Sequence, residues 1–149
     1  MIDFVKIQDE INKLLVKKYP NFTVYINKIP QDFERPSFAI EFIRNSLEEV
    51  NKGIIRETDY FTITYFAELD DYYNTDKFNL QNVLLNIQRV FRGGYIKIED
   101  RAIKVKTSNG GSNDDEIYLD LQFEYYEDRE EVKEQEEEIK EIIFSGGIS

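Results

Sequence analysis

Apolar and polar side chains alternate almost without interruption from Asp114 to Tyr126. A period of two residues is typical of a β-strand with one face in a core and the other in water. Tyrosines on the wet face favour a contact surface, because tyrosine combines a large rigid area with a polar tip. The wet face of this strand carries Tyr118, Asp120, Gln122, Glu124 and Tyr126.

Two segments instead repeat their apolar residues every three or four positions, which predicts amphipathic helices. The first covers residues 4–18, where Asp3 is a candidate N-cap and Tyr19-Pro20 ends the run. The second starts at Thr75, the predicted cap, and ends at Gly93-Gly94. Its apolar stripe consists of Leu80, Val83, Leu84, Ile87 and Phe91.

Shorter alternating runs predict further strands. Polar or glycine-rich stretches separate them, and we interpret 31–35 and 68–74 as loops, Glu99-Asp100 as a hairpin turn and 108–113 as a flexible loop. The predicted strands cover residues 22–26, 38–42, 60–66, 95–98 and 102–106.

Residues 46–58 have too little apolar surface for a buried hairpin. Asn51-Lys52-Gly53 is turn chemistry at their centre, and charged residues surround it. We therefore expect a hairpin that projects as an arm, with its return strand continuing into 60–66.

The resulting order is one helix, four strands, a helix, three strands and a last helix. Antiparallel hairpins dominate and helices are few, so the predicted class is α+β, with a mostly antiparallel sheet and two amphipathic helices packed on one face. We expect one domain over residues 1–128 and an acidic C-terminal helix with a short tail over 129–149, with Asp128 as its cap and Glu131 in the capping-box position.

The composition of the chain limits the partners and the reactions that we expect of it. The 149 residues carry a formal net charge of −11 and contain no Cys and no His. Acidity of this size opposes binding to nucleic-acid phosphates and to anionic lipid, so we expect no membrane and no specific nucleic-acid partner. The usual catalytic base and transition-metal ligand are missing. No signal peptide is visible at the N-terminus, and we expect a protein made inside the cell.

Three motifs partly match known metal, phosphate or catalytic sites, but each departs from the pattern that such a site requires. Asp114-Asp115-Glu116 lacks the spacing of a calcium loop, Arg92-Gly93-Gly94 lacks that of a phosphate loop, and the Glu-x-Lys at Glu131–Lys133 falls on a predicted helix rather than a strand. We therefore predict no enzymatic activity, no catalytic residue, no cofactor and no metal.

The segment from Glu127 to Glu141 holds nine acidic and three basic residues. It is interpreted in two ways, as a helix face that acids keep in solution or as an electrostatic docking surface for a basic partner. Both interpretations remain open. The candidate interface combines the arm, the polar loop and the wet strand, and its residues are Glu48, Glu49, Lys52, Arg56, Tyr72, Tyr73, Tyr118, Asp120, Glu124 and Tyr126.

The chain resembles the small tail terminator, or tail-completion, proteins of phages and phage-tail-like particles of Gram-positive bacteria. The resemblance spans about residues 8–128 and rests on the pattern of strands and aromatic residues rather than on a catalytic motif. The matching pieces are Glu10-Ile11-Asn12, Leu14-Leu15, Tyr19-Pro20, Val24-Tyr25, Pro36-Ser37-Phe38, residues 60–66 and residues 115–125.

The resemblance implies a structural protein that forms a homohexameric ring, caps the tail tube and anchors the top of the sheath of a contractile particle. Its implied partners are itself, the tube protein, the sheath protein and a head connector or, in a bacteriocin particle, a collar protein. It implies a place at the head-proximal end of the tail. The alternative is an acidic monomeric binding module or assembly chaperone for a basic partner.

Overall fold

The computed structural model describes residues 2–128. Two helices and six strands follow one another along the chain. They are α1 (Phe4–Lys18), β1 (Thr23–Ile26), β2 (Ser37–Asn51), β3 (Ile54–Phe66), α2 (Lys77–Phe91), β4 (Tyr95–Ile98), β5 (Arg101–Asn113) and β6 (Glu116–Asp128). The six strands form one sheet in the order β1-β2-β3-β6-β5-β4. All neighbours are antiparallel except β1 and β2, which confirms a mostly antiparallel α+β fold.

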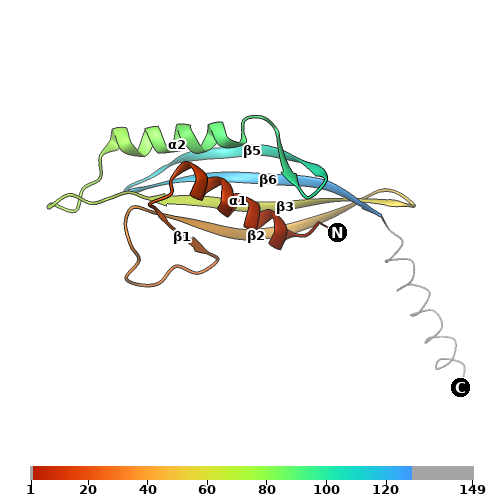
Figure 1. Cartoon of the computed structure of the whole chain (residues 1–149), viewed down its shortest axis with the longest axis horizontal. Helices are drawn as coiled ribbons and strands as arrows, with labels where there is room; N and C mark the ends of the chain where they lie inside the picture. Colours follow the sequence, from red (N-terminus) through yellow and green to blue (C-terminus); the bar gives the residue numbers. More distant parts are fainter. Residues whose placement is uncertain (1, 129–149) are drawn as a thin grey trace, which may run out of the picture.

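Both helices cover the same face of this sheet (Figure 1). Helix α1 buries Ile7, Ile11 and Leu15, and α2 buries Leu80, Val83, Ile87 and Phe91. Each such side chain contributes about 1.5–3 kcal/mol by leaving water. On the strands, every second side chain faces the core. Examples are Phe61, Ile63, Leu119, Leu121 and Phe123. Within residues 2–128, no helix covers the opposite face of the sheet.

Local chemistry sets the helix ends. The Asp3 carboxylate accepts from the Lys6 backbone N–H at 3.0 Å, and Lys17 and Lys18 lie in the last turn, where they complement the helix dipole. Helix α1 has the predicted bounds. Helix α2 is capped by Asp76, whose side chain accepts from Phe78 N–H at 2.9 Å, and not by Thr75 as predicted. Thr75 instead donates to the Asp115 carboxylate at 3.3 Å.

The predicted count of four strands before the second helix is wrong, because 38–42 and the outgoing side of the arm form one strand, β2. A register shift between Phe42 and Arg44 carries β2 through the polar segment without ending its pairing with β3. The predicted flexible loop at 108–113 is also wrong, since β5 continues to Asn113.

Two glycines explain why β5 was misread. A Cβ on Gly110 would lie 3.1 Å from the Gln88 side chain and 3.4 Å from that of Leu84, both on α2. A Cβ on Gly111 would lie 3.1 Å from the Tyr118 hydroxyl. These glycines permit close approach of the strand to its neighbours, whereas their sequence context indicated flexibility. The predicted acidic C-terminal helix falls on 129–149, outside the described residues.

Candidate assembly surfaces

The arm is an extension of three strands rather than a free hairpin. Strand β3 pairs with β2 on one side and with β6 on the other, and the second pairing runs out to Ile54 opposite Asp128. The arm projects past both helices at one end of the molecule (Figure 1). At its tip the Asn51 side chain accepts from Gly53 N–H at 2.8 Å, which closes the turn that presents Lys52. The tip is exposed, as predicted.

Four of the predicted interface residues meet on the bare face of the arm. Register places Glu48 opposite Arg56, and Arg56 opposite Tyr126. The Arg56 guanidinium pairs with Glu48 and lies 3.9 Å from the Glu124 carboxylate, and the Tyr126 hydroxyl donates to Glu124 at 3.3 Å. The carboxylate of Glu48 and the other charges nearby raise the pKa of Arg56. Glu49 lies one position further out on β2, opposite Ile55.

The same face continues inward along β6. Asp120 accepts from the Thr62 hydroxyl at 2.7 Å, and Tyr118 covers the backbone at Gly111. Beside them, the guanidinium of Arg44 stacks 4.2 Å from the centre of the Tyr60 ring. A hollow of about 360 Å³ lies here, with Ile43 at its border, 54% exposed. The wet strand face predicted from alternation is thus a mixed polar and aromatic surface.

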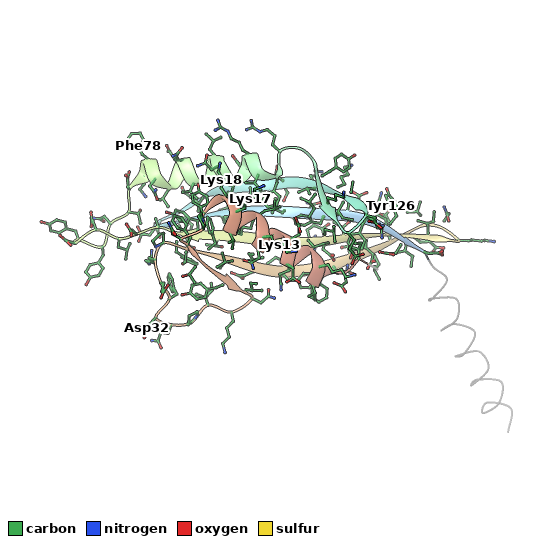
Figure 2. All side chains as sticks on the ribbon, viewed as in Figure 1. Lys13, Lys17, Lys18, Asp32, Phe78 and Tyr126 are labelled. Carbon is green, nitrogen blue, oxygen red and sulfur yellow. The ribbon has the colours of Figure 1, made fainter. Side chains whose placement is uncertain are left out.

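The remaining two predicted residues, Tyr72 and Tyr73, lie at the other end of the molecule. They are 84% and 78% exposed. The Asp70 carboxylate holds their loop by accepting from the N–H groups of Tyr72 and Asn74 at 2.8 and 2.9 Å. Tyr73 has φ of 63°, a left-handed conformation that costs a tyrosine energy. Figure 2 shows Phe78, which is 83% exposed, on the α2 end that follows this loop.

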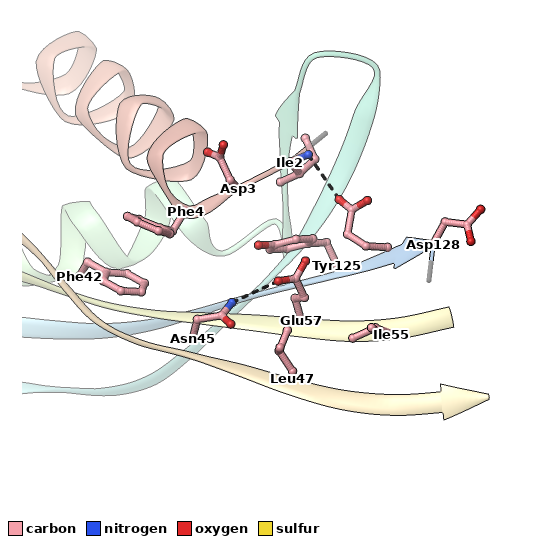
Figure 3. Close-up of a pocket in the computed structure, with 11 residues that line it drawn as sticks. Ile2, Asp3, Phe4, Phe42, Asn45, Leu47, Ile55, Glu57, Tyr125 and Asp128 are labelled. Carbon is pink, nitrogen blue, oxygen red and sulfur yellow. Dashed lines mark hydrogen bonds between the residues drawn. The ribbon is translucent and has the colours of Figure 1, made fainter. Parts of the chain in front are cut away.

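A groove at the base of the arm was missed by the sequence analysis (Figure 3). It has a volume of about 500 Å³ and lies between the N-terminus, β2, β3 and the end of β6. Its apolar lining comes from Ile2, Phe4, Phe42, Leu47 and Ile55. Four carboxylates also line it, namely Asp3, Glu57, Glu127 and Asp128.

Asp3 caps α1, and Glu127 and Glu57 accept hydrogen bonds from other segments of the chain. Glu127 accepts from Arg101 at 2.9 Å and from the Ile2 backbone N–H at 3.3 Å. Asn45 donates to Glu57 at 3.5 Å (Figure 3). Burial raises the pKa of Glu57, with the neighbouring carboxylates Asp59 and Glu127 adding to the effect. The groove is therefore an apolar recess with excess negative charge.

Beneath the groove lies a buried carboxylate, Asp59, which is 0% exposed. It accepts from Asn45 at 2.6 Å and from the Tyr125 hydroxyl at 2.8 Å. Burial raises the pKa of Asp59 despite these two donors. It also raises the pKa of Tyr125, and the carboxylate it contacts adds to that shift. One signal was present in the sequence, since Asp59 has the same parity as the core residues Phe61 and Ile63.

Residues 2–128 contain no group of three or more His, Cys, Asp or Glu side chains placed to hold a metal ion. None of the helices described there is long and apolar enough to span a membrane.

Comparison with known proteins identifies the family. The sequence model of the family described as "Phage tail terminator protein" matches residues 6–137, which includes α1 from Lys6 onward, α2, all six strands and the first residues after Asp128. No curated protein matches the chain. A match over this share of the sequence shows that the chain belongs to the phage tail terminator family.

Proposed function

We propose that this protein ends the tail tube of a phage or phage-tail-like contractile particle by forming a sixfold ring on the last ring of the tube. Membership of a structural family of tail components, matched over residues 6–137, is the observation that carries the proposal. The same membership supports a role in the virion tail rather than in catalysis. In this proposal the ring also anchors the top of the sheath and presents a head-proximal surface to a connector or collar protein.

The shape and surfaces of the described domain suit a ring subunit. A closed ring of identical subunits needs two different complementary patches on each copy, since its contacts are heterologous. The three-stranded arm offers one surface for such a contact, and the loop of Tyr72 and Tyr73, at the opposite end of the molecule, offers a separate surface for the tube (Figure 1). We place Glu48, Arg56, Glu124 and Tyr126 in contacts between subunits, and Tyr72 and Tyr73 in contacts with the tube.

The deciding experiment is removal of the gene from the genome that encodes the particle. We expect overlong or ragged tubes in electron micrographs, and a plasmid copy should restore uniform tails. Tails of normal, uniform length without the protein would contradict the proposal.

The net charge of −11 supports a second candidate, an acidic binding module or assembly chaperone for a basic partner. It predicts a salt-sensitive soluble complex and absence of the protein from purified particles, whereas a terminator stays with the particle. Mass spectrometry of purified tails separates the two.

A further inference from the structure

The groove at the base of the arm has the chemistry of a socket for an amphipathic cationic segment. Its apolar floor is built by Phe4, Phe42 and Leu47, and Leu47 is 64% exposed there. Asp3, Glu57, Glu127 and Asp128 line the same recess. An apolar side chain followed by a guanidinium would bury area on the floor and pair with the carboxylates.

The chain's own C-terminal segment is a poor occupant of this socket. The described chain ends at Asp128, beside the groove, and 21 residues follow. They carry seven acidic and three basic residues. Like charges brought together in a recess of low dielectric repel strongly, so the groove disfavours this segment and favours a cationic one.

Helix α2 presents the complementary chemistry. Its fifteen residues, Lys77–Phe91, include no Asp and no Glu, although the whole chain has 30. Because α2 buries Leu80, Val83 and Ile87, a stripe at helical spacing is left in water. We call these residues the α2 stripe: Phe78, Asn82, Leu85, Arg89 and Arg92.

The α2 stripe combines exposed apolar side chains with two arginines that take part in no salt bridge within residues 2–128. Phe78 is 83% exposed and Leu85 is 36% exposed. None of the four salt bridges found between residues 2 and 128 includes Arg89 or Arg92. Exposed apolar area beside arginines that form no salt bridge within residues 2–128 is the composition that protein interfaces favour.

The groove and the α2 stripe belong to different elements of one copy. The groove opens between the N-terminus and the arm (Figure 3), while the stripe lies on the exposed side of α2. A contact between them therefore joins two copies. The resulting dimer still has one open groove on one copy and one exposed stripe on the other. Repetition of such a head-to-tail contact closes a ring when the rotation permits it.

We propose that the groove of one copy receives the α2 stripe of the next, with Leu85 on the apolar floor and Arg89 and Arg92 on the carboxylates of Glu57 and Glu127. This inference rests on the proposed ring and names the surfaces that build it. Both partners are the same chain, so the contact needs no other tail component.

Cysteine crosslinking tests the contact directly, because the natural chain has no Cys. Full-length Leu47→Cys and Leu85→Cys proteins are mixed, assembled and treated with a short bis-maleimide. We expect a covalent dimer from the mixture and none from either variant alone. The double variant should give a ladder of oligomers. Both positions are exposed, so the variants should fold, which circular dichroism checks.

Two control pairs use the same Leu47→Cys variant. Lys17→Cys places the second thiol on exposed α1 (Figure 2) and should give no dimer. Ile143→Cys in the same chain tests the C-terminal segment as occupant, and an efficient crosslink there would overturn the proposal. So would a crosslink of Leu47→Cys with itself, which requires a twofold contact.

Charge reversal gives an independent measurement. Arg89→Glu should lower the association constant of the copies at least about tenfold, since it puts an acid against the carboxylates of the groove. Lys13→Glu makes the same change in net charge on α1 and should alter association less than about twofold. Equal effects of the two variants would overturn the proposal.

Failure of this contact is distinguishable from failure of the proposed function. Rings seen by electron microscopy at the ends of tails, together with no Leu47–Leu85 crosslink in those tails, reject the contact and leave the terminator role intact. Uniform tails formed without the protein reject the terminator role, whatever the crosslinks show.

Discussion

The two ends of the molecule are built in different ways. At the arm end, three strands extend the sheet, and the buried Asp59 carboxylate beneath the groove accepts from buried Tyr125 and from exposed Asn45. At the opposite end, one loop presents Tyr72 and Tyr73, and its turn depends on Asp70. The arm end therefore has a geometry set by long-range pairing, while the aromatic end has a geometry set by local hydrogen bonds.

The difference suggests that one end of the molecule stabilises the fold and the other end contacts a partner. Asp59 and Tyr125 at the arm base are buried, so changing them alters the free energy of unfolding. The two tyrosines make little contact with their own chain, and Tyr73 occupies a costly backbone conformation. We infer that the arm base stabilises the subunit and that the aromatic end is kept for a partner. Three predictions test this contrast.

The largest effect on stability is expected from Tyr125→Phe. It removes one of the two donors to the Asp59 carboxylate, which is 0% exposed. Loss of a hydrogen bond to a buried charged group should lower the free energy of unfolding by about 2 kcal/mol. Urea denaturation at neutral pH measures it.

Tyr126→Phe is the matched control for this change. Tyr126 is next to Tyr125 in the chain but is 49% exposed, and its hydroxyl donates to Glu124 at 3.3 Å. We expect a change within about 0.5 kcal/mol. If both variants lost the same stability, the buried network would not distinguish the arm base from its surface.

A smaller, pH-dependent effect is expected from Asp59→Asn. Burial raises the pKa of Asp59 in the folded chain, so the folded state binds this proton more tightly than the unfolded state does. The resulting stability is present below the ordinary carboxyl pKa of about 3.9 and is lost as the pH rises through the folded value. Asp59→Asn keeps the volume without the charge.

Relative to the natural chain, Asp59→Asn should therefore gain stability as the pH is raised from about 4 to 7. The expected gain is about 1.4 kcal/mol for each unit by which folding raises the pKa. Denaturation curves at several pH values measure it. A difference between the two proteins that stayed constant with pH would show that Asp59 titrates alike in the folded and unfolded chains.

The smallest effect on stability is expected from the double change Tyr72→Ala and Tyr73→Gly. Both side chains are exposed, and glycine removes the cost of the positive φ at 73. The free energy of unfolding should change by less than about 0.5 kcal/mol. Tails from a genome carrying the double change should nevertheless have irregular lengths, because the subunit loses its proposed contact with the tube.

Phe33→Ala provides the contrast for this last variant. The ring of Phe33 packs with its centroid 4.6 Å from that of Phe66 in the same chain, so its loss should reduce stability more than tail regularity. Regular tails from the tyrosine variant would assign the aromatic end no role in assembly.

Periodicity predicted the elements whose burial is regular along the chain. Helix α1 has its predicted bounds, and the alternation around Tyr118 and Asp120 became β6. The Asn51-Lys52-Gly53 turn also lies where its residues favour it. In each case the side chains report one buried face, or the turn residues have strong local preferences, so a short window of sequence contains the necessary information.

Tertiary structure decided the features that depend on a distant partner. β2 continues across its polar stretch because β3 lies beside it, and Gly110 belongs to a strand because it pairs with Leu119 of β6. The groove exists only where the N-terminus meets Glu57 and Glu127, segments far apart in sequence. Sequence alone determined which faces are apolar. Long-range pairing decided which edges meet, because its free energy depends on contacts that no local pattern records.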